Sequence, residues 1–228
     1  MPLPPGLPNA LLIIYLHGFA SSSHSGKATY LGDRLRARGF EVAVPDLNQP
    51  DFSTLTITRM LGQVQALMAG TAGRVTLFGS SLGGYVAVNA AAKWPERVDN
   101  LVLLAPALDF SDEGLGAPGG ASLSDWKRDG QIQVFHFGHG RMMPIHYGLY
   151  EDARRYDAMR ADVRMPILVF QGTRDTTVNP EIVKRWAAAR PNVTLHLFDD
   201  DHQLAASMGV IWRETERFLA TPPGRPPV

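Results

Sequence analysis

The sequence contains no cysteine, which excludes disulfide bonds, a thiol nucleophile and cysteine-ligated metals. It also lacks an excess of charge of either sign, with 22 lysines and arginines against 22 aspartates and glutamates. A basic surface for nucleic acid or an anionic membrane is therefore not expected. These absences restrict the chemistry of the chain more than its location.

Long hydrophobic runs are missing as well. The apolar run at 10–16 has only seven residues, whereas a transmembrane helix needs about 20. The first residues carry no basic cluster of the kind that begins a signal peptide. We therefore expect a soluble, cytoplasmic protein, either a monomer or a homodimer. The proline-rich tail at 221–228 is expected to be disordered.

Segments typical of strands alternate with segments typical of helices along the chain. Continuous runs rich in valine, isoleucine and leucine predict buried strands at Leu11–Leu16, Glu41–Val44, Val75–Phe78, Leu101–Leu104, Ile167–Phe170 and Val193–Phe198. Helical periodicity and helix-start signals between them predict helices at Lys27–Arg38, Ile57–Met68, Leu82–Lys93, Pro180–Ala189 and Leu204–Leu219. This alternation predicts an α/β fold in one domain over 1–228, with a mostly parallel sheet of about six or seven strands and helices on both faces.

One stretch, 111–165, is too long for an ordinary connection and follows the fourth predicted strand. It begins with a glycine-rich segment. Apolar and polar residues then alternate as in a strand at 131–137, and a segment typical of a helix follows at 149–160. An insertion at this place is expected to form a small cap over a site. Its aromatic and methionine side chains either bind substrate or only pack the insertion onto the sheet. The candidates for substrate binding are Phe19, Phe110, Met142, Met143 and Tyr147.

The segment Gly79-Ser80-Ser81-Leu82-Gly83 matches the short motif G-x-S-x-G. The motif alone is weak evidence, but here it follows an apolar strand and opens an alanine-rich helix. That setting is typical of a nucleophile elbow, whose glycines permit a strained turn and a close approach of helix to strand. Ser81 is the predicted nucleophile; the alternative is a serine that only caps the helix.

A serine hydroxyl needs a base to take its proton, and His202 is the best placed histidine. It lies between the last strand and the last helix, at the sheet edge where the elbow opens. Asp175 follows the preceding strand and would orient the imidazole. The chain order of nucleophile, acid and base is that of the α/β-hydrolases. The neighbouring acidic run Asp199–Asp201 is expected to form a solvated turn.

Attack on a carbonyl also requires two N–H groups to stabilise the oxyanion. The backbone N–H of Leu82, the residue after the nucleophile, is one candidate. The other is the N–H of Phe19, in the loop that follows the first strand. His17 in the same loop is expected to shape it and not to act as the base.

Together, Tyr15-Leu16-His17-Gly18-Phe19, Lys27-Ala28 and the run from Gly79 to Tyr85 resemble the small bacterial α/β-hydrolase esterases of the YqiA/YcfP type. The resemblance is specific over the first half of the chain, whereas the Asp175 and His202 segments match only the general superfamily pattern. It implies esterase activity on short acyl esters with a triad of Ser81, Asp175 and His202. Ser23 stands where such sequences often have proline, and the insertion does not align, so the substrate range does not transfer.

The sequence thus predicts a serine hydrolase that cleaves short-chain carboxylic esters through an acyl-enzyme on Ser81. We expect a small-molecule ester substrate, no nucleic acid or membrane partner, and neither cofactor nor metal. A thioesterase or an acyltransferase would use the same triad, and a non-catalytic ligand-binding protein would share the fold. A metal-dependent hydrolase built on His136, His139 and His146 is disfavoured, because their spacing matches no established metal site.

Overall fold

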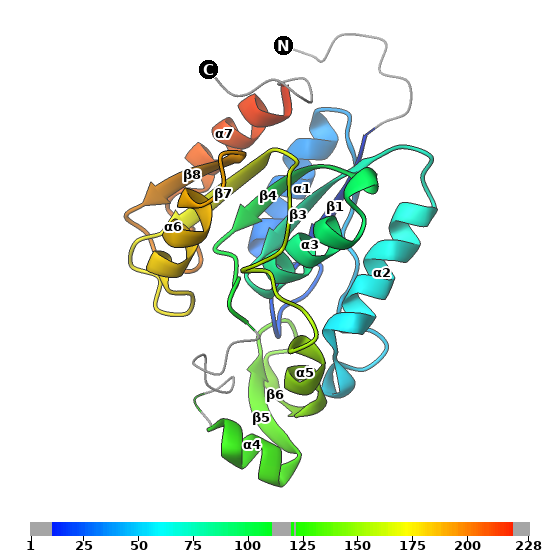
Figure 1. The fold of residues 1–228 in the computed structure, drawn as a ribbon, viewed down its shortest axis with the longest axis vertical. Helices are drawn as coiled ribbons and strands as arrows, with labels where there is room; N and C mark the ends of the chain where they lie inside the picture. The colour runs from blue at the N-terminus through cyan, green and yellow to red at the C-terminus, as the bar shows by residue number, and fades with distance from the viewer. Residues whose placement is uncertain (1–10, 111–119, 121, 221–228) are drawn as a thin grey trace.

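The computed structural model describes residues 11–110, 120 and 122–220. Its main sheet has six strands in the order β2-β1-β3-β4-β7-β8, and every neighbouring pair is parallel (Figure 1). The strands are β1 (Leu12–Leu16), β2 (Glu41–Ala43), β3 (Val75–Ser80), β4 (Val98–Leu104), β7 (Ile167–Gly172) and β8 (Val193–Phe198). The predicted parallel sheet is confirmed.

Helices cover both faces of this sheet, as predicted. One hydrophobic cluster joins the sheet to α1 (Gly26–Ala37) and α7 (Met208–Ala220). The other joins the opposite face to α2 (Ile57–Ala69), α3 (Leu82–Lys93) and α6 (Pro180–Ala188), and short 3-10 turns lie at Phe52–Thr54 and Pro95–Arg97. Within the described part of the chain, no helix combines the length and the apolarity that crossing a membrane requires.

The last helix begins at Met208, later than the predicted Leu204. Leu204 has a φ of 56° and lies in a turn, yet its side chain is fully buried in the cluster beneath α1 and α7. Leu204 is therefore apolar because it is buried in the tertiary structure, and not because it lies on the apolar face of a helix. The predicted helix start was wrong because its position happens to match the helical spacing.

The insertion forms a small lobe beyond the sheet, at the end of the molecule away from α7 (Figure 1). It consists of α4 (Leu123–Asp129), the antiparallel pair β5 (Gln131–His136) and β6 (Arg141–His146), and α5 (Gly148–Ala153). The strand predicted at 131–137 is confirmed, but β6 was missed, because its proline argues against a strand and is tolerated only at an edge. The helix predicted at 149–160 ends at Ala153. Residues 111–119 and 121 of the predicted insertion, and the tail at 221–228, lie outside the described residues.

Hydrogen bonds fix this lobe, the cap, to the helices on one face of the sheet. The hydroxyl of Tyr85 on α3 donates to the carbonyls of Ala153 at 3.1 Å and Tyr156 at 2.7 Å. The carboxylate of Asp152 on α5 accepts hydrogen bonds from the N–H and the hydroxyl of Thr58 on α2, at 2.7 and 2.6 Å. The cap is thus joined to α2 and α3 by specific contacts.

Two glycines let α3 pass close to the sheet. A Cβ added at Gly79 would lie 2.4 Å from the carbonyl oxygen of Gly83, and one added at Gly83 would lie 2.1 Å from the carbonyl oxygen of Leu16. Both partners are backbone atoms, which cannot rotate away as a side chain could. Glycine is therefore required where β1, β3 and α3 meet.

Substitution of Gly83 is expected to disrupt folding. In Gly83→Ala the methyl group would collide with β1, so the free energy of unfolding should fall by about 3 kcal/mol or more, at the upper end for overpacked sites. Gly62, inside α2 with nothing within 4 Å of an added Cβ, is the control. Gly62→Ala should raise the free energy of unfolding by about 0.5–1 kcal/mol. Urea unfolding measures both, and a Gly83→Ala protein as stable as the parent would contradict the packing described.

Candidate active site

Ser81 occupies a strained position between β3 and α3. Its φ of 52° and ψ of −117° lie in a region that residues with a side chain rarely adopt. Its N–H donates to the carbonyl of Leu104 at 3.0 Å, and its carbonyl accepts from Ala107 at 3.1 Å. These bonds from the end of β4 and the loop after it hold the sharp turn. The hydroxyl makes no capping hydrogen bond to α3.

Asp175 lies in the loop after β7, and its side chain is fully buried. One carboxylate oxygen accepts from the N–H groups of Thr177 and Val178, both at 2.8 Å, and the other accepts from the side-chain amide of Gln171 at 3.0 Å. Burial by itself would raise the pKa of this carboxyl group. The hydrogen bonds from His202 and the backbone outweigh burial and hold the pKa below its ordinary value, so Asp175 is ionised at neutral pH.

His202 lies in the loop after β8 and contacts Asp175 directly. Its Nδ1 donates to the second carboxylate oxygen of Asp175 at 2.8 Å, and its side chain is 17% exposed. This bond leaves Nε2 as the ring nitrogen that can accept a proton. The loop after β7 can approach the loop after β8 this closely only because residue 172 is glycine: a Cβ added there would lie 2.5 Å from the carbonyl oxygen of Asp200. The loops after β7 and β8 therefore pack against each other at their origin.

The structure brings Asp175 and His202 into contact and places Ser81 at the same sheet edge, where β3 ends. Within the described residues no hydrogen bond joins the Ser81 hydroxyl to the His202 ring. The backbone of His202 is, however, tied to the start of α1. Its carbonyl accepts from Nζ of Lys27 at 3.0 Å, and Lys27 is on α1, which follows the strand paired with β3.

The loop after β1 lies directly against Ser81. A Cβ added at Gly18 would be 3.4 Å from both the Ser81 Cβ and the Ser80 carbonyl oxygen. Phe19, the next residue, is therefore close to Ser81, the predicted nucleophile. Leu82 is the first residue of α3, so its N–H has no acceptor within the helix. Among the described residues, neither the Phe19 nor the Leu82 N–H donates a backbone hydrogen bond.

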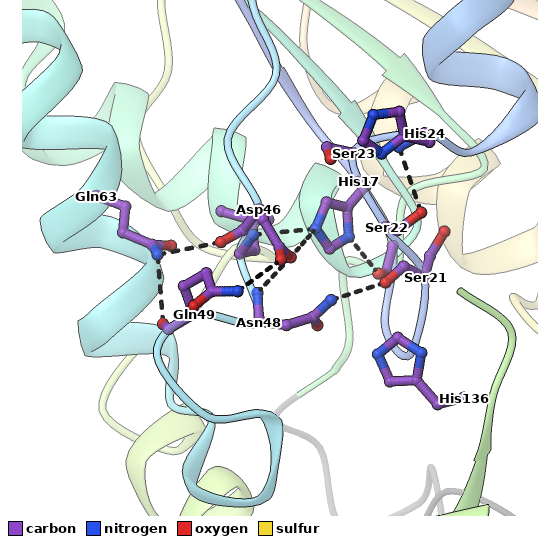
Figure 2. A network of polar contacts seen from close by, with 12 residues as sticks. His17, Ser21, Ser22, Ser23, His24, Asp46, Asn48, Gln49, Gln63 and His136 are labelled. Carbon is purple, nitrogen blue, oxygen red and sulfur yellow. Dashed lines mark hydrogen bonds and ion pairs between the residues drawn. The ribbon is translucent and has the colours of Figure 1, made fainter. Parts of the chain in front are cut away.

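The buried side chain of His17, which is 1% exposed, anchors this loop to the loop after β2. Its Nδ1 donates to the carbonyl of Gly18 at 2.9 Å, and its Nε2 accepts from the N–H of Leu47 at 3.0 Å (Figure 2). This pairing requires a neutral ring. Burial lowers the pKa of His17, and the opposing effects of Gly18 and Asp46 do not compensate. His17 is thus a structural residue, as its position in the sequence suggested.

The cap also holds the same loop, which sequence reasoning did not foresee. The N–H of Phe137, at the tip of the β5–β6 hairpin, donates to the carbonyl of Ala20 at 2.7 Å. Ala20 has a φ of 51°, which is rare for alanine. On the other side, the side-chain amide of Asn48 donates to the carbonyl of Ser21 at 2.8 Å (Figure 2). No local pattern in the sequence signals these contacts, because they join segments far apart in the chain.

The three histidines of the cap do not gather at one place. His136 is fully buried, and its Nδ1 accepts from the N–H of His139 at 3.2 Å. His146 pairs with Gln131, at the opposite end of the hairpin. In the described part of the chain, no group of three histidine or acidic side chains is arranged to hold a metal ion.

The five residues predicted to bind substrate lie in different surroundings. The rings of Phe19 and Phe52 are 5.5 Å apart, and those of Phe110 and Tyr85 are 5.7 Å apart. Met143 and Tyr147 are partly buried against the core. Met142 is 55% exposed on the other face of the hairpin from Met143, as neighbours in a strand must be. Their role in binding stays a prediction.

Asp200 corrects the expectation of a solvated acidic turn. It is 5% exposed, and its carboxylate accepts from the N–H and hydroxyl of Ser207 at 3.0 and 2.8 Å. Burial would raise its pKa, but these bonds hold the pKa below the ordinary value. Asp200 therefore ties the His202 loop to the segment before α7, while Asp199 is 86% exposed and fits the original expectation.

Comparison with known proteins agrees with this architecture. A model of an uncharacterised protein family, UPF0227, matches residues 12–216. Est1E of Butyrivibrio proteoclasticus, solved with ferulic acid bound, aligns with a TM-score of 0.80 and 19% identity over 93% of this chain and 90% of that one. The mouse alpha/beta hydrolase domain-containing protein 10 aligns with a TM-score of 0.74 and 20% identity over 91% and 89%. These likenesses show an α/β-hydrolase fold.

A curated relative matches only part of the chain. The biotin biosynthesis bifunctional protein BioHC of Teredinibacter turnerae is 30% identical over 104 residues, which is 43% of this chain and 18% of that protein. The chain thus spans less than a fifth of that relative's length.

Loss of the His17 ring is expected to loosen the loop after β1. In His17→Leu the buried N–H of Leu47 has no acceptor, which should lower the free energy of unfolding by about 1–3 kcal/mol. His24→Leu, in the same loop but exposed, is the control and should change it by less than about 0.5 kcal/mol. Denaturant unfolding gives both values. Equal effects of the two substitutions would show that His17 does not anchor the loop.

Proposed function

The chain belongs to the UPF0227 family and has the α/β-hydrolase fold, and from this premise we propose that it is a serine hydrolase that cleaves short-chain carboxylic esters. The observation that carries the proposal is the hydrogen-bonded pair of Asp175 and His202 at the sheet edge where the strained Ser81 lies. An aspartate and a histidine with structural roles alone would not need to be paired beside a strained serine. The fold by itself does not decide the function.

In the proposed reaction, the Ser81 oxygen attacks the ester carbonyl carbon while Nε2 of His202 takes the hydroxyl proton. The carbonyl oxygen becomes an oxyanion and accepts hydrogen bonds from the N–H groups of Phe19 and Leu82. The intermediate collapses, the alcohol leaves with the proton from His202, and an acyl-enzyme remains on Ser81. Water, deprotonated by His202, then releases the acid and restores the serine.

Asp175 supports both proton transfers. Because its carboxylate is ionised and fully buried, it holds the Nδ1–H tautomer and stabilises the imidazolium that forms during attack. Thioester hydrolysis and acyl transfer to an alcohol share every one of these steps. The acyl group, the leaving group and the acceptor must therefore be decided by assay, with p-nitrophenyl esters of increasing length beside matched thioesters.

Removal of the nucleophile should abolish turnover. Ser81→Ala is expected to lower kcat for p-nitrophenyl acetate by roughly 10⁶-fold, the loss seen when a catalytic serine is removed from a hydrolase. Ser124→Ala, on the exposed surface of α4, is the control and should leave kcat unchanged. A fluorophosphonate probe should label the parent on Ser81, as read by peptide mass spectrometry. Full turnover by Ser81→Ala would end the proposal.

Removal of the charge on Asp175 should also slow the reaction. Asp175→Asn keeps the shape of the side chain but favours the wrong imidazole tautomer, so kcat is expected to fall by about 10⁴-fold. Asp199→Asn neutralises an exposed carboxylate in the loop that carries His202 and should have little effect. Steady-state kinetics separates the two. If both variants lose activity equally, the loss comes from removing a negative charge near His202 and not from removing the contact between Asp175 and His202.

A further inference from the structure

We propose that Lys27 is a positioning residue that holds the backbone of His202, so that the imidazole meets Ser81 in the geometry for proton transfer. This inference rests on the proposed function, because it assigns a role within the same site. The hydrogen bond of Lys27 goes to the carbonyl of His202 and not to its ring. It acts through the main chain of the base.

The first observation is the hydrogen bond itself. Nζ of Lys27 donates to the carbonyl oxygen of His202 at 3.0 Å, across 175 positions of sequence. Lys27 stands in the first turn of α1, which the side chain of Ser25 caps by accepting from the N–H of Ala28. The ammonium group therefore projects from a fixed helix start, and the contact joins that start to the loop after β8.

The second observation is the charge around the ammonium group. Asp175, from the loop after β7, and Asp200 and Asp201, from the loop after β8, all interact electrostatically with Lys27. Asp175 and Asp200 are buried and ionised, as their hydrogen bonds show. Lys27 supplies positive charge at the place where these two loops meet. Without it, carboxylates from both loops would repel one another in a partly buried site.

The third observation is that the ring of His202 is otherwise held only through Asp175 among the hydrogen bonds described for its side chain. That bond orients the ring, and Asp200 ties the loop to Ser207 from two residues before His202. Lys27 adds an attachment at the carbonyl of His202 itself. Displacement of a catalytic group by 1 Å can cost about 10²-fold in rate, so such an attachment affects kcat.

Burial lowers the pKa of Lys27 to about 8, and the attraction of Asp175, Asp201 and Asp200 opposes this shift. Lys27 is therefore mostly charged at pH 7 and loses its charge as the pH rises past 8. Asp175 and Asp200, two of the carboxylates that face it, are already ionised there, so the lysine is the group that titrates. In the parent, kcat should decline above about pH 8 as the bond to His202 weakens.

The test compares Lys27→Met, Lys27→Arg and the control Lys184→Met, which removes a partly exposed ammonium group paired with Glu181 on α6. Lys27→Met should lower kcat for p-nitrophenyl acetate by roughly 10- to 100-fold with little change in KM, because the base is misplaced while the substrate still binds. Lys27→Arg keeps a charged donor and should recover most of kcat. In Lys27→Arg, kcat should no longer decline at alkaline pH, because a guanidinium group stays charged. Lys184→Met should match the parent.

Failure of this inference differs from failure of the proposed function. If Ser81→Ala is inactive and Lys27→Met has the parent's kcat, or Lys27→Arg is as slow as Lys27→Met, the positioning role is wrong and the serine hydrolase stands. If Ser81→Ala keeps full turnover, the proposed function itself is wrong. If circular dichroism shows that Lys27→Met does not fold, the pH profiles of kcat for the parent and for Lys27→Arg decide. An alkaline decline of kcat that persists unchanged in Lys27→Arg would overturn the positioning role.

Discussion

The structure depends on how closely α3 passes the ends of β1 and β3. At Gly83 an added Cβ would lie 2.1 Å from the backbone of Leu16, so only a glycine permits the helix to begin where it does. That approach forces Ser81 into a φ of 52°, which sets its side chain at the head of the helix. It also brings Gly18 to within contact distance of Ser81, so the loop that offers the N–H of Phe19 lies beside the hydroxyl. One steric constraint thus positions both the proposed nucleophile and one side of the proposed oxyanion site.

The proposed base is positioned by a second set of constraints, where β7 and β8 end. Gly172 lets the loops after β7 and β8 meet, and Asp175 and His202 form their hydrogen bond just beyond that point. Asp200 and Lys27 then tie the same loop to the segment before α7 and to α1. Each contact is polar and buried or partly buried, where a missing partner is costly. The histidine loop is therefore fixed by charge and hydrogen bonds as well as by the buried side chain of Leu204.

The cap takes part in the site through backbone contacts and not only through side chains. The tip of its hairpin donates to Ala20, one residue after Phe19, while Asn48 holds Ser21 from the other side. The cap is itself anchored to α3 through Tyr85. The loop after β1 is consequently held between the sheet, the loop after β2 and the hairpin. The insertion therefore supports the loop that carries Phe19, whose N–H is a proposed oxyanion donor.

The sequence by itself determined the order of strands and helices, the turn at Ser81 and the placement of Asp175 and His202 at strand ends, because each of these follows from local periodicity and glycine spacing. Only the tertiary structure decided which distant groups meet. The pairing of β6, the burial of Asp200 and the reach of Lys27 to His202 join segments that share no local pattern. Their energies come from burial and from partners supplied by other parts of the chain, and neither is encoded in the spacing of neighbouring residues.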